Sequence, residues 1–170
     1  MKELLLGCGS KKNKRVFLTG ESPKWEGELI TLDMEALHEP DIVWNLENRP
    51  LPFDDNSFDR IHAYEILEHV GHQGDFRGFF EEFGEYWRIL KPNGLLLGTC
   101  PAWNSQGAWG DPSHTRVISP MSFTFLSQEA YKDVGKSVMS DFRSIWKKDF
   151  LPQYYDVDAE TFTFVLKVVK

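Results

Sequence analysis

The sequence has few cysteines, no long apolar run and no excess of positive charge. Its 170 residues include only Cys8 and Cys100, which are too few for a disulfide framework or a cysteine-rich zinc site. No apolar run approaches the length that crosses a membrane. The formal net charge of -7 argues against a broad nucleic-acid-binding surface. Because the first residues also lack the pattern of a signal peptide, we expect a cytoplasmic protein that does not enter a membrane.

The composition is that of a globular domain with an unusually aromatic interior. Hydrophobic residues make up 41% and charged residues 26% of the chain, and its length fits one domain with its own core. Aromatic residues reach 14%, with six Trp and thirteen Phe. We therefore expect a single domain over residues 1–170, with aromatic packing and an aromatic-lined pocket.

A short apolar run near the start ends in a glycine turn. Leu4 to Leu6 lead directly into Gly7, Cys8 and Gly9. This pattern is typical of a buried strand in an open α/β sheet, where a nucleotide-like ligand sits beyond the carboxyl end of the strand. A tight loop without a ligand is the other interpretation of the same residues.

A second strand, over residues 29–33, ends in an acid. Asp33 lies 24 positions after Gly9, a spacing that suits hydrogen bonds to ribose hydroxyls, and it could equally cap a short helix over residues 34–37. Residues 16–28 contain several helix breakers and no helical period, so the helix that usually follows such a turn is predicted to be short or missing.

The rest of the chain predicts further strands, one long helix and one long loop. Residues 76–90 carry apolar side chains at helical spacing, and the Lys91–Gly94 segment stops that helix. Residues 101–120 form a polar, turn-rich loop on the substrate side. The last two strands are expected to be antiparallel, because the link between them is too short for a parallel crossover. The expected strands are residues 4–6, 29–33, 41–46, 60–64, 95–100, 142–150 and 161–169, and a second helix is expected over residues 120–131.

A series of segments in the first two thirds of the chain carries a resemblance to a known family. The segments are, in order, LLLGCGS (4–10), ITLD (30–33), DIVWNL (41–46), LPF (51–53), SFDRI (57–61), EILEH (65–69) and EYWRILKPNG (85–94). They resemble class I S-adenosylmethionine-dependent methyltransferases, the small Rossmann-like type of the methyltransferase type 11 group, over residues 3 to 101. The resemblance implies a mostly parallel seven-stranded sheet with a C-terminal antiparallel pair, here with a reduced first helix.

The resemblance implies S-adenosylmethionine as cofactor and a role for each matching residue. The backbone of Gly7, Cys8 and Gly9 would pack against its methionine part, and Asp33 would hold the ribose. Three features depart from the family pattern: the third glycine of the turn is absent, asparagine replaces the usual aspartate at position 45, and the first helix is reduced. The remaining cofactor-binding residues that the family pattern implies are Asn45 and Leu46 at the adenine, and Tyr64 and Glu65 at the methionine end.

The methyl acceptor is expected to be a small molecule, because no added substrate domain and no nucleic-acid methyltransferase signature is present. His114 is the first candidate for a general base and His69 the second, although both are also compatible with ordinary surface or structural roles. Trp103, Asp111 and Arg116 are the candidate substrate-side residues. Arg116 could bind an acidic group of the substrate or pair with Asp111.

Three other functions are compatible with parts of the sequence. A nicotinamide-dependent oxidoreductase needs a helix N-terminus after the glycine turn, which the breakers disfavour. A metal enzyme is disfavoured because the inverted zinc motif needs histidine at position 65, so no metal is expected. A non-catalytic binding module with the same fold is the main alternative. Titration with S-adenosylmethionine and S-adenosylhomocysteine tests the methyltransferase interpretation, because absence of binding to both would exclude it. Binding alone does not distinguish an enzyme from a binding module that keeps the cofactor site.

Overall fold

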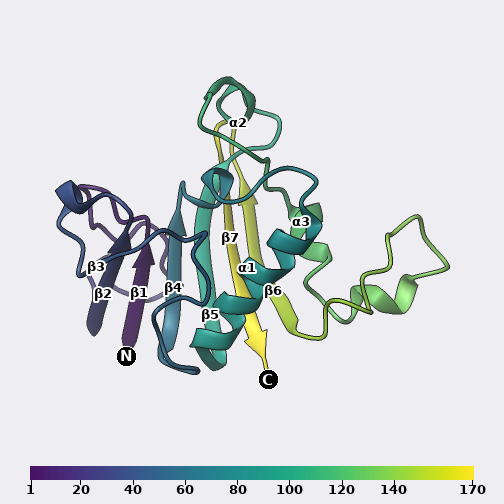
Figure 1. The fold of residues 1–170 in the computed structure, drawn as a ribbon, viewed down its shortest axis with the longest axis horizontal. Coiled ribbons are helices and arrows are strands. Elements are labelled where there is room, and N and C mark those ends of the chain that lie inside the picture. The colour runs from purple at the N-terminus through teal and green to yellow at the C-terminus, as the bar shows by residue number, and fades with distance from the viewer.

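The computed structural model describes all residues from 1 to 170, and it is built on one seven-stranded sheet in the order β3-β2-β1-β4-β5-β7-β6 (Figure 1). The first five strands pair in parallel, and β7 is antiparallel to both of its neighbours. This arrangement confirms the predicted α/β fold and its C-terminal antiparallel pair. The strands are β1 (Lys2–Leu6), β2 (Glu28–Asp33), β3 (Ile42–Val43), β4 (Phe58–Tyr64), β5 (Leu90–Pro101), β6 (Asp149–Val157) and β7 (Thr161–Val169).

The strand β1 is fixed between β2 and β4. Leu4, Leu5 and Leu6 are almost completely buried, because both neighbours of β1 and both faces of the sheet are covered at this point. A continuous apolar run is what a strand in this position requires. The end of β1 is therefore held rigidly at the centre of the sheet.

One long helix, α1 (Phe76–Ile89), covers one face of the sheet in front of β5 and β7 (Figure 1). Asp75 caps its N-terminus by accepting a hydrogen bond from the backbone N–H of Gly78 at 3.0 Å. Phe80, Phe83 and Tyr86 on its inner side are buried in the main core. The aromatic stripe seen in the sequence is thus a core face, as expected.

The remaining helices are short. They are η1 (Ala36–His38), η2 (Leu67–His69), α2 (Gln106–Gly110), α3 (Pro120–Thr124) and η3 (Ala130–Asp133). The prediction of one helix over residues 120–131 is therefore wrong in its middle part, where the chain turns at residues 125–129. None of the helices is both long and apolar enough to span a lipid bilayer.

The position of the sixth strand also differs from the prediction. The expected strand 142–150 overlaps β6 only at its last two residues, and β6 continues through Pro152. Proline is tolerated there because β6 is an edge strand, and the pairing shifts its register between Pro152 and Tyr154. Residues 142–148 instead form turns, and Phe142 stacks on Phe76 of α1 with 5.3 Å between ring centres.

No helix lies between β1 and β2, which confirms the reduced first helix. The connecting segment covers the second face of the sheet with a small apolar cluster and a buried polar network. His62 on β4 joins Glu3 through Nε2 and the Tyr64 hydroxyl through Nδ1, each at 2.7 Å. The same hydroxyl accepts a hydrogen bond from the backbone N–H of Val16 at 3.2 Å. Burial lowers the pKa of His62.

Two cationic side chains complete this network. Lys14 is buried 3.7 Å from both Glu3 and Glu21. Arg60 forms a two-pronged hydrogen-bonded ion pair with Glu21. Burial opposes the charge on Glu3, yet His62 and Lys14 hold the pKa of Glu3 below its ordinary value. Charged groups thus fasten to the sheet a segment that a helix would otherwise occupy.

The pair between Glu21 and Arg60 predicts a pH-dependent stability. Hydrogen bonds from Arg60 lower the pKa of Glu21 from 4.5 to about 2. Its stabilising effect is therefore complete above about pH 5 and is lost as the pH falls toward about 2. We expect Glu21→Gln to lower the free energy of unfolding at neutral pH by about 1–2 kcal/mol, and to flatten its dependence on pH in this acidic range.

Urea unfolding at a series of pH values measures this effect. Glu26→Gln is the matched control, because Glu26 lies exposed on the same segment. It should change the free energy of unfolding by less than about 0.5 kcal/mol. Equal losses in the two variants would contradict the assignment.

Candidate functional site

A cavity of about 350 Å³ lies at the carboxyl ends of β1, β2 and β4. Its walls are apolar where Trp44, Leu46, Ile66 and Val70 face it. Polar side chains come from several segments: Asp33 at the end of β2, Asn45 and Glu47 after β3, and His69, His72 and Thr115 farther along the chain. An apolar cavity with a few fixed polar groups at the ends of parallel strands is the expected ligand site of an open α/β sheet.

The glycine turn approaches this cavity without side chains. Gly7 and Gly9 have φ values of +55° and +54°, in the left-handed region. A Cβ on Gly7 would lie 2.5 Å from Cδ1 of Ile66, whereas a Cβ on Gly9 would meet nothing within 4 Å. Gly7 is therefore required by packing against Ile66, and Gly9 leaves open space beside the turn.

Asp33 connects the turn to the end of β2. Its carboxylate accepts hydrogen bonds from the backbone N–H groups of Gly9 at 2.8 Å and of Glu35 at 2.9 Å. The residue is 8% exposed. Each carboxylate oxygen has a second lone pair that these bonds do not use, so Asp33 can hold the turn and still accept hydrogen bonds from a ligand.

The structure brings some of the predicted cofactor residues together and separates others. Gly7, Asp33, Asn45 and Leu46 all line the cavity. The sequence analysis assigned no cofactor role to several other lining residues, although Trp44 and Ile66 lie inside the matching segments 41–46 and 65–69 and Val70 directly follows the second. The unassigned lining residues are Leu32, Met34, Trp44, Glu47, Ile66, Val70, His72 and Thr115.

The other predicted cofactor residues lie outside the cavity wall. The Cys8 side chain belongs to the small apolar cluster on the second face of the sheet, together with Tyr64. The hydroxyl of Tyr64 is held in the polar network by His62 and Val16. Tyr64 therefore does not line the cavity, although the family pattern implied a position at the methionine end of the cofactor. Glu65 follows β4 with a φ of +52°, and its backbone N–H donates to the carbonyl of Thr99 at 2.9 Å.

The loop over residues 101–120 folds back onto η2. The backbone N–H groups of Thr115 and Arg116 both donate to the carbonyl of Glu68, at 2.9 and 3.3 Å. These bonds place His114 beside His69, with 4.8 Å between their ring centres. The two candidate bases, distant in sequence, are therefore neighbours, and His69 lines the cavity.

The buried carboxylate of Glu68 adjoins these histidines. Glu68 is 2% exposed, and burial raises its pKa to about 7, with a further contribution from the neighbouring charge of Glu65. Burial, together with the charge of Glu68, also raises the pKa of the Cys100 thiol well above its ordinary value. Glu68 directly precedes His69 in the sequence, but no local pattern indicates that its carboxylate is buried.

The pairing of Arg116 with Asp111, one of the two alternatives that the sequence suggested, does not occur. The guanidinium of Arg116 is buried and contacts both carboxylate oxygens of Glu82, at 2.7 and 2.8 Å. Its Nε also donates to the carbonyl of Leu67 at 2.7 Å. This pairing leaves Arg116 a structural role at the base of the loop.

The other two substrate-side candidates lie apart from the cavity. Trp103 packs edge-on against Phe162 of β7, with 5.7 Å between ring centres. Asp111 is exposed and binds the backbone and hydroxyl of Ser113, which hold the pKa of Asp111 below its ordinary value. Only Asp111 is near a candidate base, 3.9 Å from Nε2 of His114.

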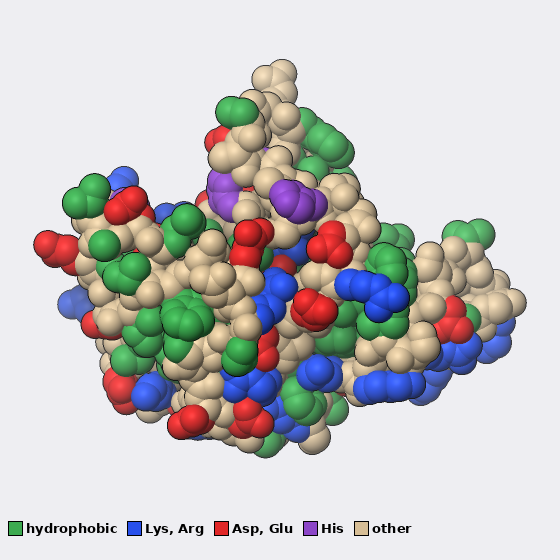
Figure 2. All heavy atoms as spheres, viewed as in Figure 1, with side chains coloured by type: hydrophobic (Ala, Val, Ile, Leu, Met, Phe, Trp, Pro, Cys, Tyr) green, Lys and Arg blue, Asp and Glu red, His purple; other side chains and the backbone are tan.

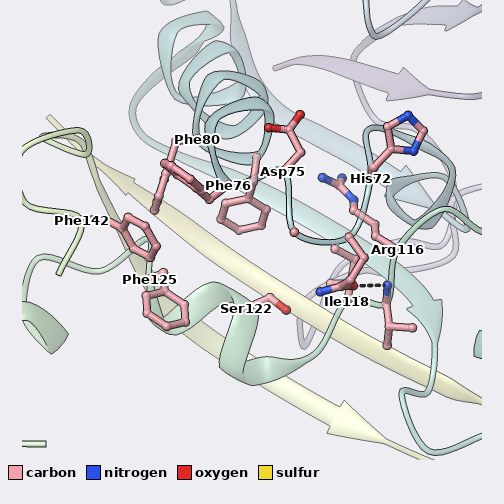
Figure 3. A pocket seen from close by; sticks show the side chains of 13 residues that line it. His72, Asp75, Phe76, Phe80, Arg116, Ile118, Ser122, Phe125 and Phe142 are labelled. Atoms are coloured by element: carbon pink, nitrogen blue, oxygen red, sulfur yellow. Dashed lines mark hydrogen bonds between the residues drawn. The ribbon is translucent and has the colours of Figure 1, made fainter. Parts of the chain in front are cut away.

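A second cavity, of about 210 Å³, adjoins the first, and His72 lines both. Figure 3 shows Phe76, Phe80, Phe125 and Phe142 gathered on one side of it and Arg116 on the other. This cavity matches the aromatic-lined pocket expected from the composition. It is suited to an apolar molecule with a polar end.

Comparisons with known proteins place the fold. A family model described as a methyltransferase domain matches residues 4–98. The chain is similar to a crystal structure of a SAM-dependent methyltransferase from Archaeoglobus fulgidus, with 13% identity, a TM-score of 0.59, and coverage of 98% of this chain and 85% of that one. No curated protein sequence matches the chain.

Two further solved structures are similar over nearly the whole chain. A SAM-dependent methyltransferase from Methanosarcina mazei has 14% identity and a TM-score of 0.58, with 99% of this chain and 92% of that one covered. Geranyl diphosphate C-methyltransferase from Streptomyces coelicolor, solved with S-adenosyl-L-homocysteine, has 12% identity and a TM-score of 0.57, with 99% and 69% covered. At these low sequence identities, the three solved structures show a similarity of fold alone.

The contact between Gly7 and Ile66 predicts unequal effects of alanine at the two glycines of the turn. Gly9→Ala meets only the strain of a positive φ, which costs about 1–2 kcal/mol of stability. Gly7→Ala meets the same strain and also displaces Ile66, so we expect a loss of about 2–4 kcal/mol in the free energy of unfolding. Urea unfolding of the two variants measures the difference, and a larger loss for Gly9→Ala would contradict this account of the turn.

Proposed function

The chain belongs to the class I S-adenosylmethionine-dependent methyltransferases, and on that premise we propose that it transfers a methyl group from S-adenosylmethionine to a small-molecule acceptor. The observation that carries the proposal is the first cavity, where the glycine turn, Asp33 and an apolar wall meet. The proposed unit is a single domain over residues 1–170, with residues 101–120 on the substrate side.

The residues of the cavity fit the parts of this cofactor. Asp33 has free lone pairs beside the turn and suits the ribose hydroxyls. Trp44 and Leu46 offer apolar surface for the adenine, and Asn45 offers an amide beside it. The space beside Gly9 suits close approach of the methionine part to the backbone of residues 7–9. The solved S-adenosyl-L-homocysteine complex of a protein with the same fold supports the assignment.

Bound S-adenosylmethionine supplies a methyl group that is already activated by its positively charged sulfur. The protein then has to align the acceptor and exclude water. The apolar wall formed by Ile66 and Val70 excludes water from the cavity, and Glu65 is proposed to face the methionine end. The second cavity, shared through His72, is the proposed place of the acceptor.

The proton released by a hydroxyl or amine acceptor requires a base on the substrate side. His114 and His69 are the proposed acceptors of that proton, because they lie together where the loop over residues 101–120 meets the cavity. The absence of a helix between β1 and β2 also disfavours a nicotinamide cofactor, whose diphosphate needs a helix N-terminus there.

A binding module without catalysis is the second candidate, and one observation favours it. The glycine turn is followed by a loop and a polar network rather than by a helix, so the methionine end of the cofactor would meet no helix N-terminus there. Such a module would bind the cofactor without turning it over.

Calorimetric titration with S-adenosylmethionine and S-adenosylhomocysteine tests the proposal. We expect the wild type to bind both, and Asp33→Asn to bind at least roughly tenfold more weakly, because a charge-assisted acceptor becomes neutral. Asp54→Asn is the control, since Asp54 is exposed in a distant loop. Absence of binding to both compounds would overturn the proposal.

Formation of S-adenosylhomocysteine during incubation with a panel of hydroxyl and amine acceptors separates the two candidates. Turnover with any acceptor establishes the enzyme. Tight cofactor binding without turnover across the panel favours the binding module.

A further inference from the structure

Three side chains with metal-binding atoms converge where η2 meets the loop over residues 101–120. One ligand atom from each of Glu68, His69 and His114 lies within 4.8 Å of the other two. Figure 2 shows two separate histidine patches on the surface below the α2 segment, with acidic side chains beneath them. The convergence joins residues more than 40 positions apart, and the loop contacts with the Glu68 carbonyl hold it in place.

The carboxylate of Glu68 pairs with no Lys or Arg side chain, and among donors only the weak S–H of Cys100 approaches it. Both of its oxygens are buried and accept no hydrogen bond. A buried carboxylate is costly unless it is paired or binds a metal ion. The nearest buried cation, Arg116, is committed to Glu82 through both of its terminal nitrogens. The structure therefore leaves a buried carboxyl group whose charged form lacks a cation.

The two imidazoles are arranged as metal-bound histidines usually are. Nδ1 of His69 lies 3.2 Å from the carbonyl of Ser113, so this nitrogen carries the proton and Nε2 keeps its lone pair. That Nε2 lies 4.0 Å from Oε1 of Glu68. A ligating histidine typically donates its other N–H to a carbonyl or carboxylate in this way.

His114 has the same two-sided environment. Its Nδ1 is buried without a hydrogen-bond partner, and its Nε2 lies 3.9 Å from a carboxylate oxygen of Asp111. The Asp111 carboxylate thus lies near one ring nitrogen, beyond hydrogen-bond distance, while the other ring nitrogen is buried and unpartnered. Two buried unpartnered groups, Glu68 and Nδ1 of His114, thus belong to one cluster.

We infer that Glu68, His69 and His114 bind a divalent transition-metal ion at the edge of the first cavity. Two imidazoles and one carboxylate are the ligand set of zinc and non-haem iron centres, whereas Mg²⁺ and Ca²⁺ prefer oxygen ligands. Three protein ligands leave a coordination position open, as in catalytic rather than structural sites. The open position would be available to water or to an oxygen atom of an acceptor.

This site changes the roles assigned to the histidines. With an ion bound, His69 and His114 are ligands rather than general bases, and the ion itself lowers the pKa of a bound hydroxyl. The sequence argument against a metal concerned only a motif that needs histidine at position 65. The third ligand comes from the distant loop. Metal binding is a property of the protein that can be measured whether or not the proposed methyl transfer is correct.

Titration of untagged, chelator-treated protein with Co²⁺ and Zn²⁺ tests the inference. We expect one equivalent of Co²⁺ to bind, with visible absorption bands from the coordinated ion, and Zn²⁺ to displace it. Glu68→Gln and His114→Ala should each weaken binding at least roughly tenfold. His72→Ala is the matched control, because His72 is an exposed histidine three residues from His69, and it should bind as the wild type does.

Circular dichroism of each variant shows that the fold persists. A wild type that binds no Co²⁺ or Zn²⁺ at millimolar concentration would overturn the inference and leave the histidines as candidate bases. An equal loss of metal binding in His72→Ala and His114→Ala would overturn it too. Loss of cofactor binding alone would count against the proposed function and not against the metal site.

Discussion

The hydrogen bond from the backbone N–H of Gly9 to the carboxylate of Asp33 joins the ends of two neighbouring parallel strands. It can form only because β1 and β2 run in the same direction and end side by side. The bond fixes the glycine turn against the cavity and fixes the carboxylate beside it. Both halves of the proposed cofactor site therefore depend on one register, in which Leu6 is opposite Leu32. A slip of one residue would turn Asp33 to the other face of the sheet.

The missing first helix explains the polar network on the second face. A helix at this position would bury the sheet with apolar side chains, whereas the connecting segment offers only a few. The sheet instead presents His62 and Glu3, which are buried and hydrogen-bonded to each other. Burial of such groups is costly where their partners are incomplete, and Oε1 of Glu3 and Nζ of Lys14 are buried without a hydrogen bond. The network thus gives the segment one defined position. The loss of one partner would cost more free energy in this network than the loss of one contact in an apolar core.

The sequence was sufficient for the order of the elements and for the residues at strand ends. Local patterns of apolar residues and breakers predict the strand Leu4 to Leu6, the strand end at Asp33 and a helix over residues 76–90. The structure confirms all three, with the helix ending at Ile89. The sequence was insufficient where tertiary contacts determine the position of a strand or the direction of a side chain. The position of β6 depends on pairing with β7 rather than on the propensity of residues 142–148. Tyr64 follows the alternation of β4 to the second face, which a strand-end motif does not show.

The same distinction applies to the substrate side. No local signal indicates that Arg116 pairs with Glu82, because the two residues belong to a loop and a helix 34 positions apart. That pair closes the base of the loop, and the backbone bonds of residues 115 and 116 to the Glu68 carbonyl then determine where His114 lies. Since His69 lines the cavity and also belongs to the proposed metal site, the two sites share one side chain. Any ligand that moves η2 must act on both, so cofactor and metal affinities should be thermodynamically coupled, each changing the other by the same factor.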